Sequence, residues 1–203
     1  TLAAIAGTGV TFENTTDLTA GATGPGGTAI AGNVTLTAPS LRLNDVLATG
    51  TVALNATAGI ITQAAGVRLA AGTLRAGATG AVTLDAANGD GTARNEIADI
   101  DALSAGTDIT LRNALDLTIN LPLSVGADHV LTLEAPNLVI GDSLSAGAGG
   151  RIVLRTGSFN GGTASGGDIT QTGGTISTPL LAALAGGAVS LDRAGNAIGS
   201  LGG

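Results

Sequence analysis

The sequence has no cysteine, methionine, tryptophan or tyrosine, and it has two phenylalanines and one histidine in 203 residues. Without cysteine there is no disulfide framework, no thiolate metal site and no cysteine nucleophile. Lysine is absent as well, and eight arginines face 15 carboxylates. The chain therefore lacks the positive charge that neutralises phosphates and the aromatic surfaces on which bases stack, which excludes a nucleic-acid partner.

Small residues predominate in the composition: 34 Gly, 37 Ala and 28 Thr make up almost half of the chain. Gly and Pro together are 39 of 203 residues, below the roughly 25–30% of low-complexity coil, so the chain is expected to fold. No basic patch followed by an apolar run opens the sequence, so no signal peptide is expected in it. Its charge-free stretches, such as 46–67, are interrupted by polar residues, which excludes a membrane-spanning helix.

An internal repeat of about 100 residues runs through the whole chain. Residues 6–19 return as 105–118, an offset of 99, and residues 95–100 return as 196–201, an offset of 101. Three shorter matches keep the same order: 36–41 with 133–138, 61–63 with 169–171, and 82–85 with 189–192. We expect two tandem units, residues 1–101 and 102–203, joined without a linker.

Within each unit, short triplets place a small residue between two apolar ones, an alternation that is typical of strands. Gly, Asn, Asp and Pro separate the triplets, as turns require. No window favours an amphipathic helix, and only the Ala- and Leu-rich residues 179–185 are compatible with a helical turn. The predicted core positions are Val10, Phe12, Val34, Leu36, Val52, Leu54, Val82, Leu84, Ile109, Leu111, Leu131, Leu133, Ile152, Leu154, Val189 and Leu191.

Strands this short favour an all-β solenoid, in which each rung pairs with the next and needs little length of its own. At roughly 20 residues per rung the chain makes about ten rungs, a rod roughly 48 Å long. A narrow interior accounts for the scarcity of rings, and glycine suits corners with positive φ. Asn14 and Asn113, which match in the repeat, are predicted corner residues, because Asn tolerates the left-handed region and bonds local backbone. Neither end carries a polar cap, so we expect a section of a longer array or one that continues end to end.

Three segments of the second unit, 169–176, 184–191 and 195–201, resemble the repeats of filamentous haemagglutinin-like adhesins, as do 61–63, 80–84 and 95–97 in the first. The resemblance covers nearly the whole chain. It implies a right-handed parallel β-helix, exported across a Gram-negative outer membrane by two-partner secretion or as an autotransporter passenger. The Asn-Pro-Asn motif of that family's secretion domain is absent, which fits a shaft segment and leaves the export route open.

Parallel β-helices also host polysaccharide-active enzymes, whose chemistry uses clustered carboxylates with shifted pKa values. The best cluster here is Glu96, Asp99 and Asp101 with Arg94 nearby, and a solvated turn is its expected role. His129 is expected to be exposed in a loop, with a pH switch as the alternative. With one histidine and no cysteine, the sequence has almost none of the side chains that usually bind zinc.

Two glycine-rich segments complete the search for sites. Residues 88–91 resemble half of a calcium loop, but the ligand spacing and the terminal Glu are missing, so a tight turn is expected. The run 158–168 has no Lys and no helix after it, so it is not a phosphate loop; residues 157–167 are expected to be a loop inserted into the second unit. The sequence therefore predicts no catalytic, cofactor-binding or metal-binding residue, and no cofactor.

The central residues of the triplets are expected to point outward and, if the rungs align, to form one uncharged stripe along the rod. A solvated strand surface, lateral packing of rods and ice binding are the three interpretations of such a stripe. Its members are Thr11, Thr35, Ala53, Thr83, Thr110, Thr132, Val153 and Ser190.

These features lead us to expect a structural shaft segment of a bacterial surface or extracellular fibre, not an enzyme, that works by rigid reach and self-association. Its expected partners are further copies or neighbouring repeats of a longer chain, with no membrane insertion. The alternative is an adhesin module that binds host or matrix molecules through inserted loops such as 157–167. An acidic-glycan enzyme and an ice-binding solenoid are lesser alternatives.

Overall fold

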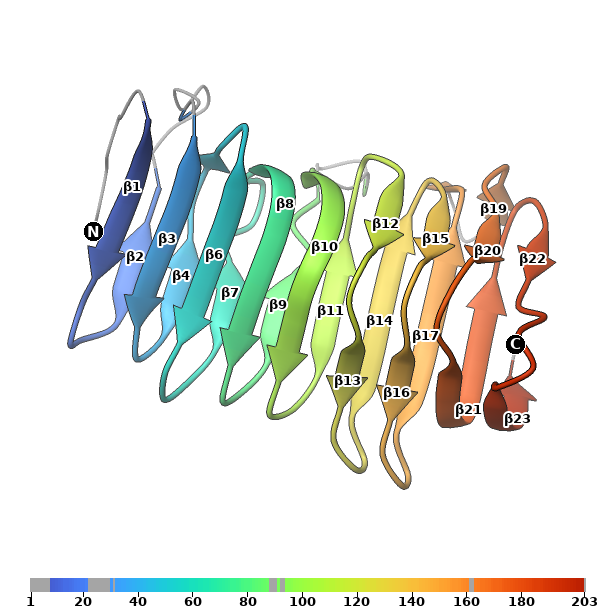
Figure 1. The fold of residues 1–203 in the computed structure, drawn as a ribbon. Helices are drawn as coiled ribbons and strands as arrows, with labels where there is room; N and C mark the ends of the chain where they lie inside the picture. The colour runs from blue at the N-terminus through green and yellow to red at the C-terminus, as the bar shows by residue number, and fades with distance from the viewer. Residues whose placement is uncertain are drawn as a thin grey trace.

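The computed structural model describes residues 8–21, 30, 32–87, 91, 94–160 and 163–202, and the chain winds into a rod of stacked turns (Figure 1). These described residues form strands, turns and bends, and no helix. The expected all-β, parallel β-solenoid is confirmed, with about eight turns where about ten were predicted. Some turns are longer than 20 residues: Leu138 pairs with Ile169, its neighbour one turn later.

Each turn has three strand positions, which form three faces of the rod. The first face contains β1 (Gly9–Glu13), β3 (Asn33–Ala38), β6 (Thr51–Ala56), the second halves of β8 (Leu69–Ala78) and β10 (Glu96–Ala105), β13 (Leu123–Val125), β16 (Leu144–Ala146) and the first parts of β21 (Ile176–Leu184) and β23 (Ala197–Gly202). The second face contains β2 (Leu18–Ala20), β4 (Leu41–Leu43), β7 (Ile61–Gln63), β9 (Val82–Leu84), β11 (Ile109–Arg112), β14 (Val130–Ala135), β17 (Arg151–Thr156) and the second parts of β21 and β23. The third face contains β5 (Val46–Leu47), the first halves of β8 and β10, β12 (Leu117–Ile119), β15 (Leu138–Ile140), β20 (Ile169–Gln171) and β22 (Val189–Ser190).

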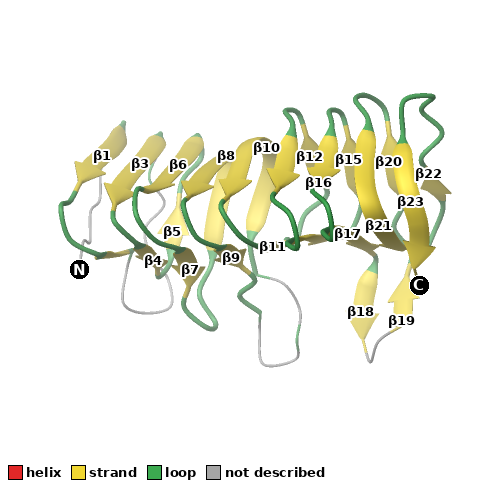
Figure 2. Cartoon of the chain, turned by 90° about the horizontal axis from the view of Figure 1, so that it is seen from below, coloured by secondary structure: helices red, strands yellow, loops and turns green. Residues whose placement is uncertain are grey.

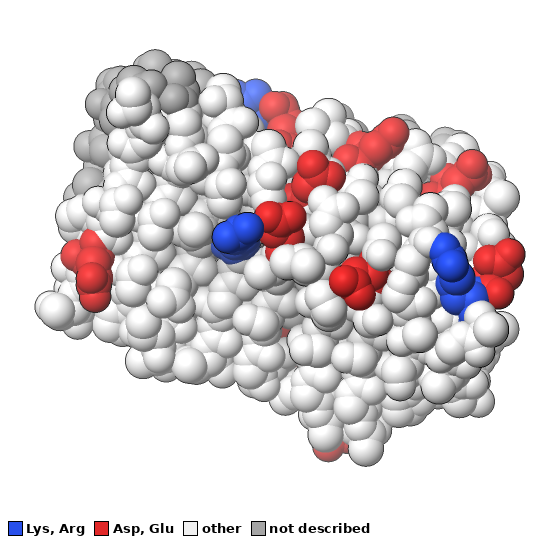
Figure 3. Space-filling model, viewed as in Figure 1, with Lys and Arg blue, Asp and Glu red and all other residues white. Residues whose placement is uncertain are grey.

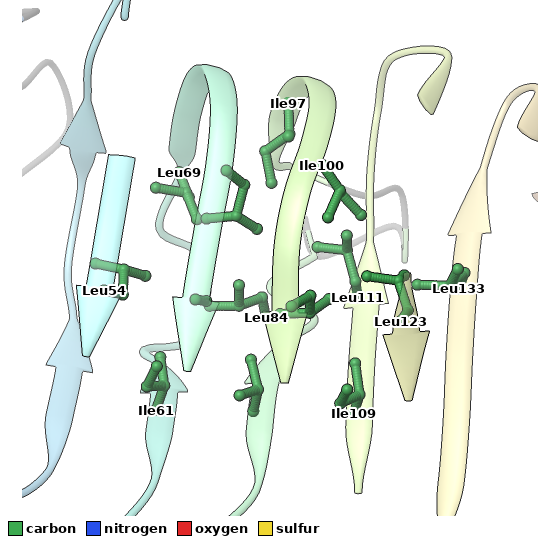
Figure 4. Close-up of a cluster of buried hydrophobic side chains, with 14 of the residues drawn as sticks. Leu54, Ile61, Leu69, Leu84, Ile97, Ile100, Ile109, Leu111, Leu123 and Leu133 are labelled. Carbon is green, nitrogen blue, oxygen red and sulfur yellow. The ribbon is translucent and has the colours of Figure 1, made fainter. Parts of the chain in front are cut away.

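Because side chains alternate along a strand, each triplet sends its two apolar residues inward. On the second face the column Val82, Ile109, Leu131 and the column Leu84, Leu111, Leu133 pair in register, and all six side chains are fully buried. Figure 4 shows Leu84, Leu111 and Leu133 in a row within one continuous core. Full burial of one such side chain stabilises the fold by about 1.5–3 kcal/mol.

Twelve of the sixteen predicted core residues are buried, and the other four belong to the two ends of the rod. Val10 and Phe12 in the first turn and Leu191 in the last are half-buried, while Val189 is 46% exposed. These four residues have a neighbouring turn on one side alone among the described residues, which explains their exposure.

The two sequence units are related by a rotation about the axis of the rod as well as by a shift along it. Val10 lies on the first face, whereas its equivalent Ile109 lies on the second. The first face of turns one to five consists, in order, of β1, β3, β6, β8 and β10. Ile109 lies in β11, the strand that follows β10 on the second face. Val10 and Ile109 are therefore separated by four turns and one third of a turn.

The other matched pairs show the same displacement. Leu36 on the first face matches Leu133 on the second, and Val82 on the second face matches Val189 on the third. Ile97 on the third face matches Ile198 on the first. The structural element that repeats is therefore one strand with the corner that follows it. Each 100-residue unit contains thirteen such elements: twelve in four full turns of three strands, and one in the additional third of a turn.

Stacked glycines form one of the corners that join these strands. Gly80 N–H donates to Gly59 O at 2.8 Å, and Gly106 N–H donates to Gly80 O at 3.1 Å. A Cβ at Gly106 would overlap the carbonyl oxygen of Thr79 in the preceding turn. Glycine is required here for close approach of two turns rather than for a positive φ, which is not the role that the sequence predicted.

Gly106→Ala is expected to lower the free energy of unfolding by about 1–3 kcal/mol, because overpacking forces two stacked turns apart. Gly77→Ala is the matched control, since a Cβ there would meet only the Ser104 hydroxyl, at 3.4 Å. Urea unfolding followed by circular dichroism measures both. Equal losses in the two variants would show that the Gly106 corner is not a close contact.

One local expectation is wrong and another is confirmed. Residues 179–185 do not form a helical turn, because β21 continues as a strand through Leu184 and pairs with β17 from Leu180 to Leu184. Asn14 and Asn113 lie at the predicted corners directly after β1 and β11, and each donates to the backbone carbonyl two residues further on; neither has a positive φ. The residue that does is Asp128, with a φ of 62°, the only non-glycine of this kind among the described residues.

Candidate functional site

The most completely bonded polar group in the described interior is the side chain of Asn95, which is fully buried at the corner before β10. Its amide exchanges two hydrogen bonds with the amide of Gln63, at 2.6 and 3.1 Å. Its oxygen also accepts from Leu69 N–H, and its nitrogen donates to Leu84 O and Arg112 O. The side chain therefore ties three consecutive turns together.

The second unit contains the same arrangement one face further on. Asn196 and Gln171 exchange two bonds at 3.0 and 2.8 Å. Asn196 also accepts from Ile176 N–H and donates to Leu191 O. Sequence reasoning missed this pair of amide networks, although their residues stand in the repeated segments: Gln63 matches Gln171 and Asn95 matches Asn196.

The predicted acidic cluster lies along strand β10, not in a solvated turn. Glu96 bonds Arg68 at 3.1 Å and Asp101 bonds Arg75 at 2.9 Å, each reaching back to the preceding turn. Figure 3 shows acidic side chains spread over this view of the rod rather than gathered at one point. Glu96 and Asp101 therefore bind neighbouring turns to each other.

A column of alternating charge crosses the second face, where Arg112, Glu134 and Arg155 occupy paired positions in successive turns. Arg112 donates to Glu134 Oε1 from Nη2 at 2.9 Å and from Nε at 3.0 Å. The Glu134 side chain is 11% exposed, so its carboxylate depends on these donors.

Arg112→Ala is expected to lower the free energy of unfolding by about 1–3 kcal/mol, because it leaves a nearly buried carboxylate without its donor. Arg75→Ala is the matched control: that arginine is 57% exposed, and loss of a surface ion pair costs under about 1 kcal/mol. Chemical unfolding curves compare the two. If both variants lost the same stability, Glu134 would not depend on Arg112.

His129 is half-buried, not an exposed loop residue. Its Nδ1 lies 3.4 Å from Asp108 Oδ1 in the preceding turn, and the same oxygen accepts from Val130 N–H at 2.9 Å. The imidazole therefore takes part in stacking of the two turns.

No group of three or more metal-ligating side chains occurs among the described residues, and no helix in that part of the chain could span a membrane. The candidate calcium turn, residues 88–91, lies outside the described residues except for Gly91.

The predicted uncharged stripe is divided among the three faces. Thr11, Thr35 and Ala53 pair on the first face, and Ser190 lies on the third. Thr83, Thr110, Thr132 and Val153 form one column on the second face, extended by Thr62. The triplets do not align into a single stripe, because Thr83 lies one face beyond Thr11, Thr35 and Ala53 within the first unit, and because the matched triplets of the two units lie a further face apart.

The inserted segment of the second unit contains two short strands. β18 (Ser158–Asn160) and β19 (Thr163–Ser165) pair as an antiparallel hairpin. Figure 2 shows that this hairpin projects from the rod between β17 and β20. It is the only antiparallel strand pair in the described ranges, so it differs from the stacked turns around it.

Within the described part of the chain, the strands at the two ends of the rod have an unpaired edge. Among the described residues β1 pairs only with β3, β22 only with β20, and β23 only with β21. Apolar side chains are exposed at the last turn, with Leu201 at 78% and Leu184 at 48%. These edges are the surfaces of the rod best suited to add a further strand.

No protein-family model, curated protein or solved structure matches this chain.

Proposed function

We propose that this protein is a shaft segment of a bacterial cell-surface or extracellular fibre, and that its work is mechanical: to span distance and to associate with further segments of the same kind. One observation carries the proposal. A single hydrophobic core runs from Leu18 to Leu181 through successive turns, without a break between the two sequence units. The likeness of its repeats to filamentous haemagglutinin-like adhesins supports a place outside the cell.

The polar groups support the same function, because they bind one turn to the next. Arg68, Arg75 and Arg112 each pair with a carboxylate one turn further on. The Asn95 amide bonds the turns on both sides of it. In a solenoid each turn contacts only its neighbours, so contacts of this kind add up along the rod and stiffen it.

Immunogold electron microscopy of intact producing cells tests the proposal, with an antibody raised against the purified chain. We expect gold particles along fibres that extend from the cell surface, and none on cells in which the coding sequence is deleted. Labelling confined to the interior of sectioned cells would contradict the proposal.

A ligand-binding adhesin module is the second candidate, favoured by the hairpin of β18 and β19 that projects from the rod. Its test is adhesion of beads that carry the protein to host-cell and matrix surfaces, with and without residues 157–167. Loss of binding on deletion, with unchanged thermal unfolding, would support this function; equal binding would exclude the hairpin as the recognition element.

A further inference from the structure

The apolar residues exposed at the last turn are buried at the equivalent positions of the first unit. Val189 is 46% exposed and Leu201 is 78% exposed, whereas their equivalents Val82 and Ile100 are fully buried. The second unit buries the latter two: Ile109 of β11 pairs with Val82, and Ile119 of β12 pairs with Ile100. We call the contact between the first and the second unit the joint inside the chain. This joint shows what covers a strand edge of this type: the first two strands of the following unit, here β11 and β12.

The amide network at the last turn lacks the bond that the following unit supplies. Asn95 and Asn196 make matching bonds to Gln63 and Gln171, to Leu84 and Leu191, and to Leu69 and Ile176. Asn95 Nδ2 additionally donates to the carbonyl oxygen of Arg112 in β11, at 3.0 Å. The residue that matches Arg112 is Glu13 at the end of β1.

The first turn carries the other half of the joint. Asn113 Nδ2 donates to Leu115 O, and Asn14 Nδ2 donates to Thr16 O in the same way, both at 2.8 Å. Asn113 also bonds the backbone N–H and C=O of Ile97 in the first unit, at 2.9 and 2.7 Å. The residue that matches Ile97 is Ile198, in β23 of the last turn.

We propose that a second copy of this chain docks head to tail on the last turn, with its β1 on β22 and its β2 on β23, in the register in which β11 and β12 stack on β9 and β10. This inference rests on the proposed shaft function and specifies its self-association. In this register Val10, Thr11 and Phe12 of one copy lie opposite Val189, Ser190 and Leu191 of the other, as Ile109–Leu111 lie opposite Val82–Leu84.

The geometry of the docked pair follows from the displacement of the two units. Each unit advances four turns and one third, so each added copy advances eight turns and two thirds. With about 4.8 Å per turn, the filament lengthens by about 42 Å per copy. The core columns continue through the joint, and two exposed edges become paired strands.

The joint between copies differs from the joint inside the chain in charge. Inside the chain Leu84 pairs with Leu111, and the residues that follow them are Asp85 and Arg112, a carboxylate beside a cation. In the docked pair the equivalent residues are Asp192 and Glu13, which are both carboxylates. Two carboxylates in neighbouring turns repel each other, and salt screens the repulsion. Association should therefore strengthen with added salt, and Glu13→Arg should strengthen it further.

Cysteine cross-linking tests the register directly, because the chain has no cysteine of its own. Thr11→Cys combined with Ser190→Cys places two thiols at directly opposed positions, within the 4.4–6.8 Å Cα separation that a disulfide spans. Within one copy these residues stand at opposite ends of the rod (Figure 1). We expect a ladder of disulfide-linked oligomers on mild oxidation, and no ladder from the control pair Thr11→Cys with Ser124→Cys, whose second position is exposed in the middle of the rod.

Sedimentation velocity of the unmodified protein over a hundredfold range of concentration supplies the second readout. We expect oligomers that grow with concentration, a loss of at least tenfold in association for Leu201→Asp, and no loss for Leu121→Asp, whose side chain is 44% exposed away from the last turn. Thermal unfolding of monomeric samples shows that both variants are folded.

Monomers at every concentration would overturn the head-to-tail docking, as would oligomers that persist unchanged in Leu201→Asp, which would indicate lateral packing. Equal cross-linking of the two cysteine pairs would overturn the register. The immunogold test is independent of these results. If it labelled a surface fibre while the purified protein stayed monomeric, the proposed shaft function would be retained and only the head-to-tail docking would be rejected.

Discussion

Leu84→Asp is expected to lower the free energy of unfolding by at least about 4 kcal/mol, because it places a carboxylate in a core that offers it no partner. Leu84 is fully buried and pairs in its column with Leu111 of the next turn, which is also fully buried. Leu84 belongs to the continuous apolar core of the rod. Denaturant unfolding, followed by the strand signal in circular dichroism, measures the loss.

Thr83→Asp is the matched control, one residue earlier on the same strand. Thr83 is half-buried on the outer surface, where its column neighbours are Thr62 and Thr110. We expect a loss below about 1 kcal/mol, as for most surface substitutions. If the two variants lost equal stability, the assignment of inward and outward positions in β9 would be wrong.

Asn95→Ala is expected to cost about 3–5 kcal/mol, although it removes only a small polar side chain. It removes the side-chain acceptor of the Leu69 N–H and one donor each from the carbonyls of Leu84 and Arg112, and a buried group left unsatisfied costs about 1–3 kcal/mol. The Gln63 amide loses both of its bonds to Asn95 and keeps those to Val67 O and Ala86 N–H. The loss should appear as a lower denaturant midpoint and a lower melting temperature.

Asn55→Ala provides the comparison, because Asn55 is exposed on β6. Its expected effect is within about 0.5 kcal/mol of zero. A mild Asn95→Ala variant, close in stability to Asn55→Ala, would show that the amide network does not hold the three turns together.

The core of the rod could be predicted from sequence because alternation of apolar residues is a local property. Val82-Thr83-Leu84 shows by itself which residues point inward, and twelve of the sixteen predicted core residues are buried. The four others, from Val10 to Leu191, depend on which turns lie beside them, and that is set by the order of stacking rather than by the triplet.

The arrangement of faces could not be predicted, because it depends on how many strands lie between two matched segments. A repeat of about 100 residues is compatible with any number of corners, and only pairing shows that Ile109 lies one face beyond Val10. Strand pairing also decides on which face each outward residue lies, and the sequence alone does not supply it. The outward residues of the predicted stripe therefore divide among three faces. The amide networks were missed because a buried Asn is recognised by its backbone partners, which come from turns distant in sequence.

A distance between two spin labels tests the central claim, that residues far apart in sequence stack in one straight column. Thr62 and Val153 are separated by four pairings in the second face, through Thr83, Thr110 and Thr132. Labels on Thr62→Cys and Val153→Cys, attached without interference because the chain has no cysteine, should give a narrow distance distribution centred near 19 Å, at about 4.8 Å per turn. A broad distribution, or a distance beyond about 40 Å, would contradict the stacked column and with it the rod.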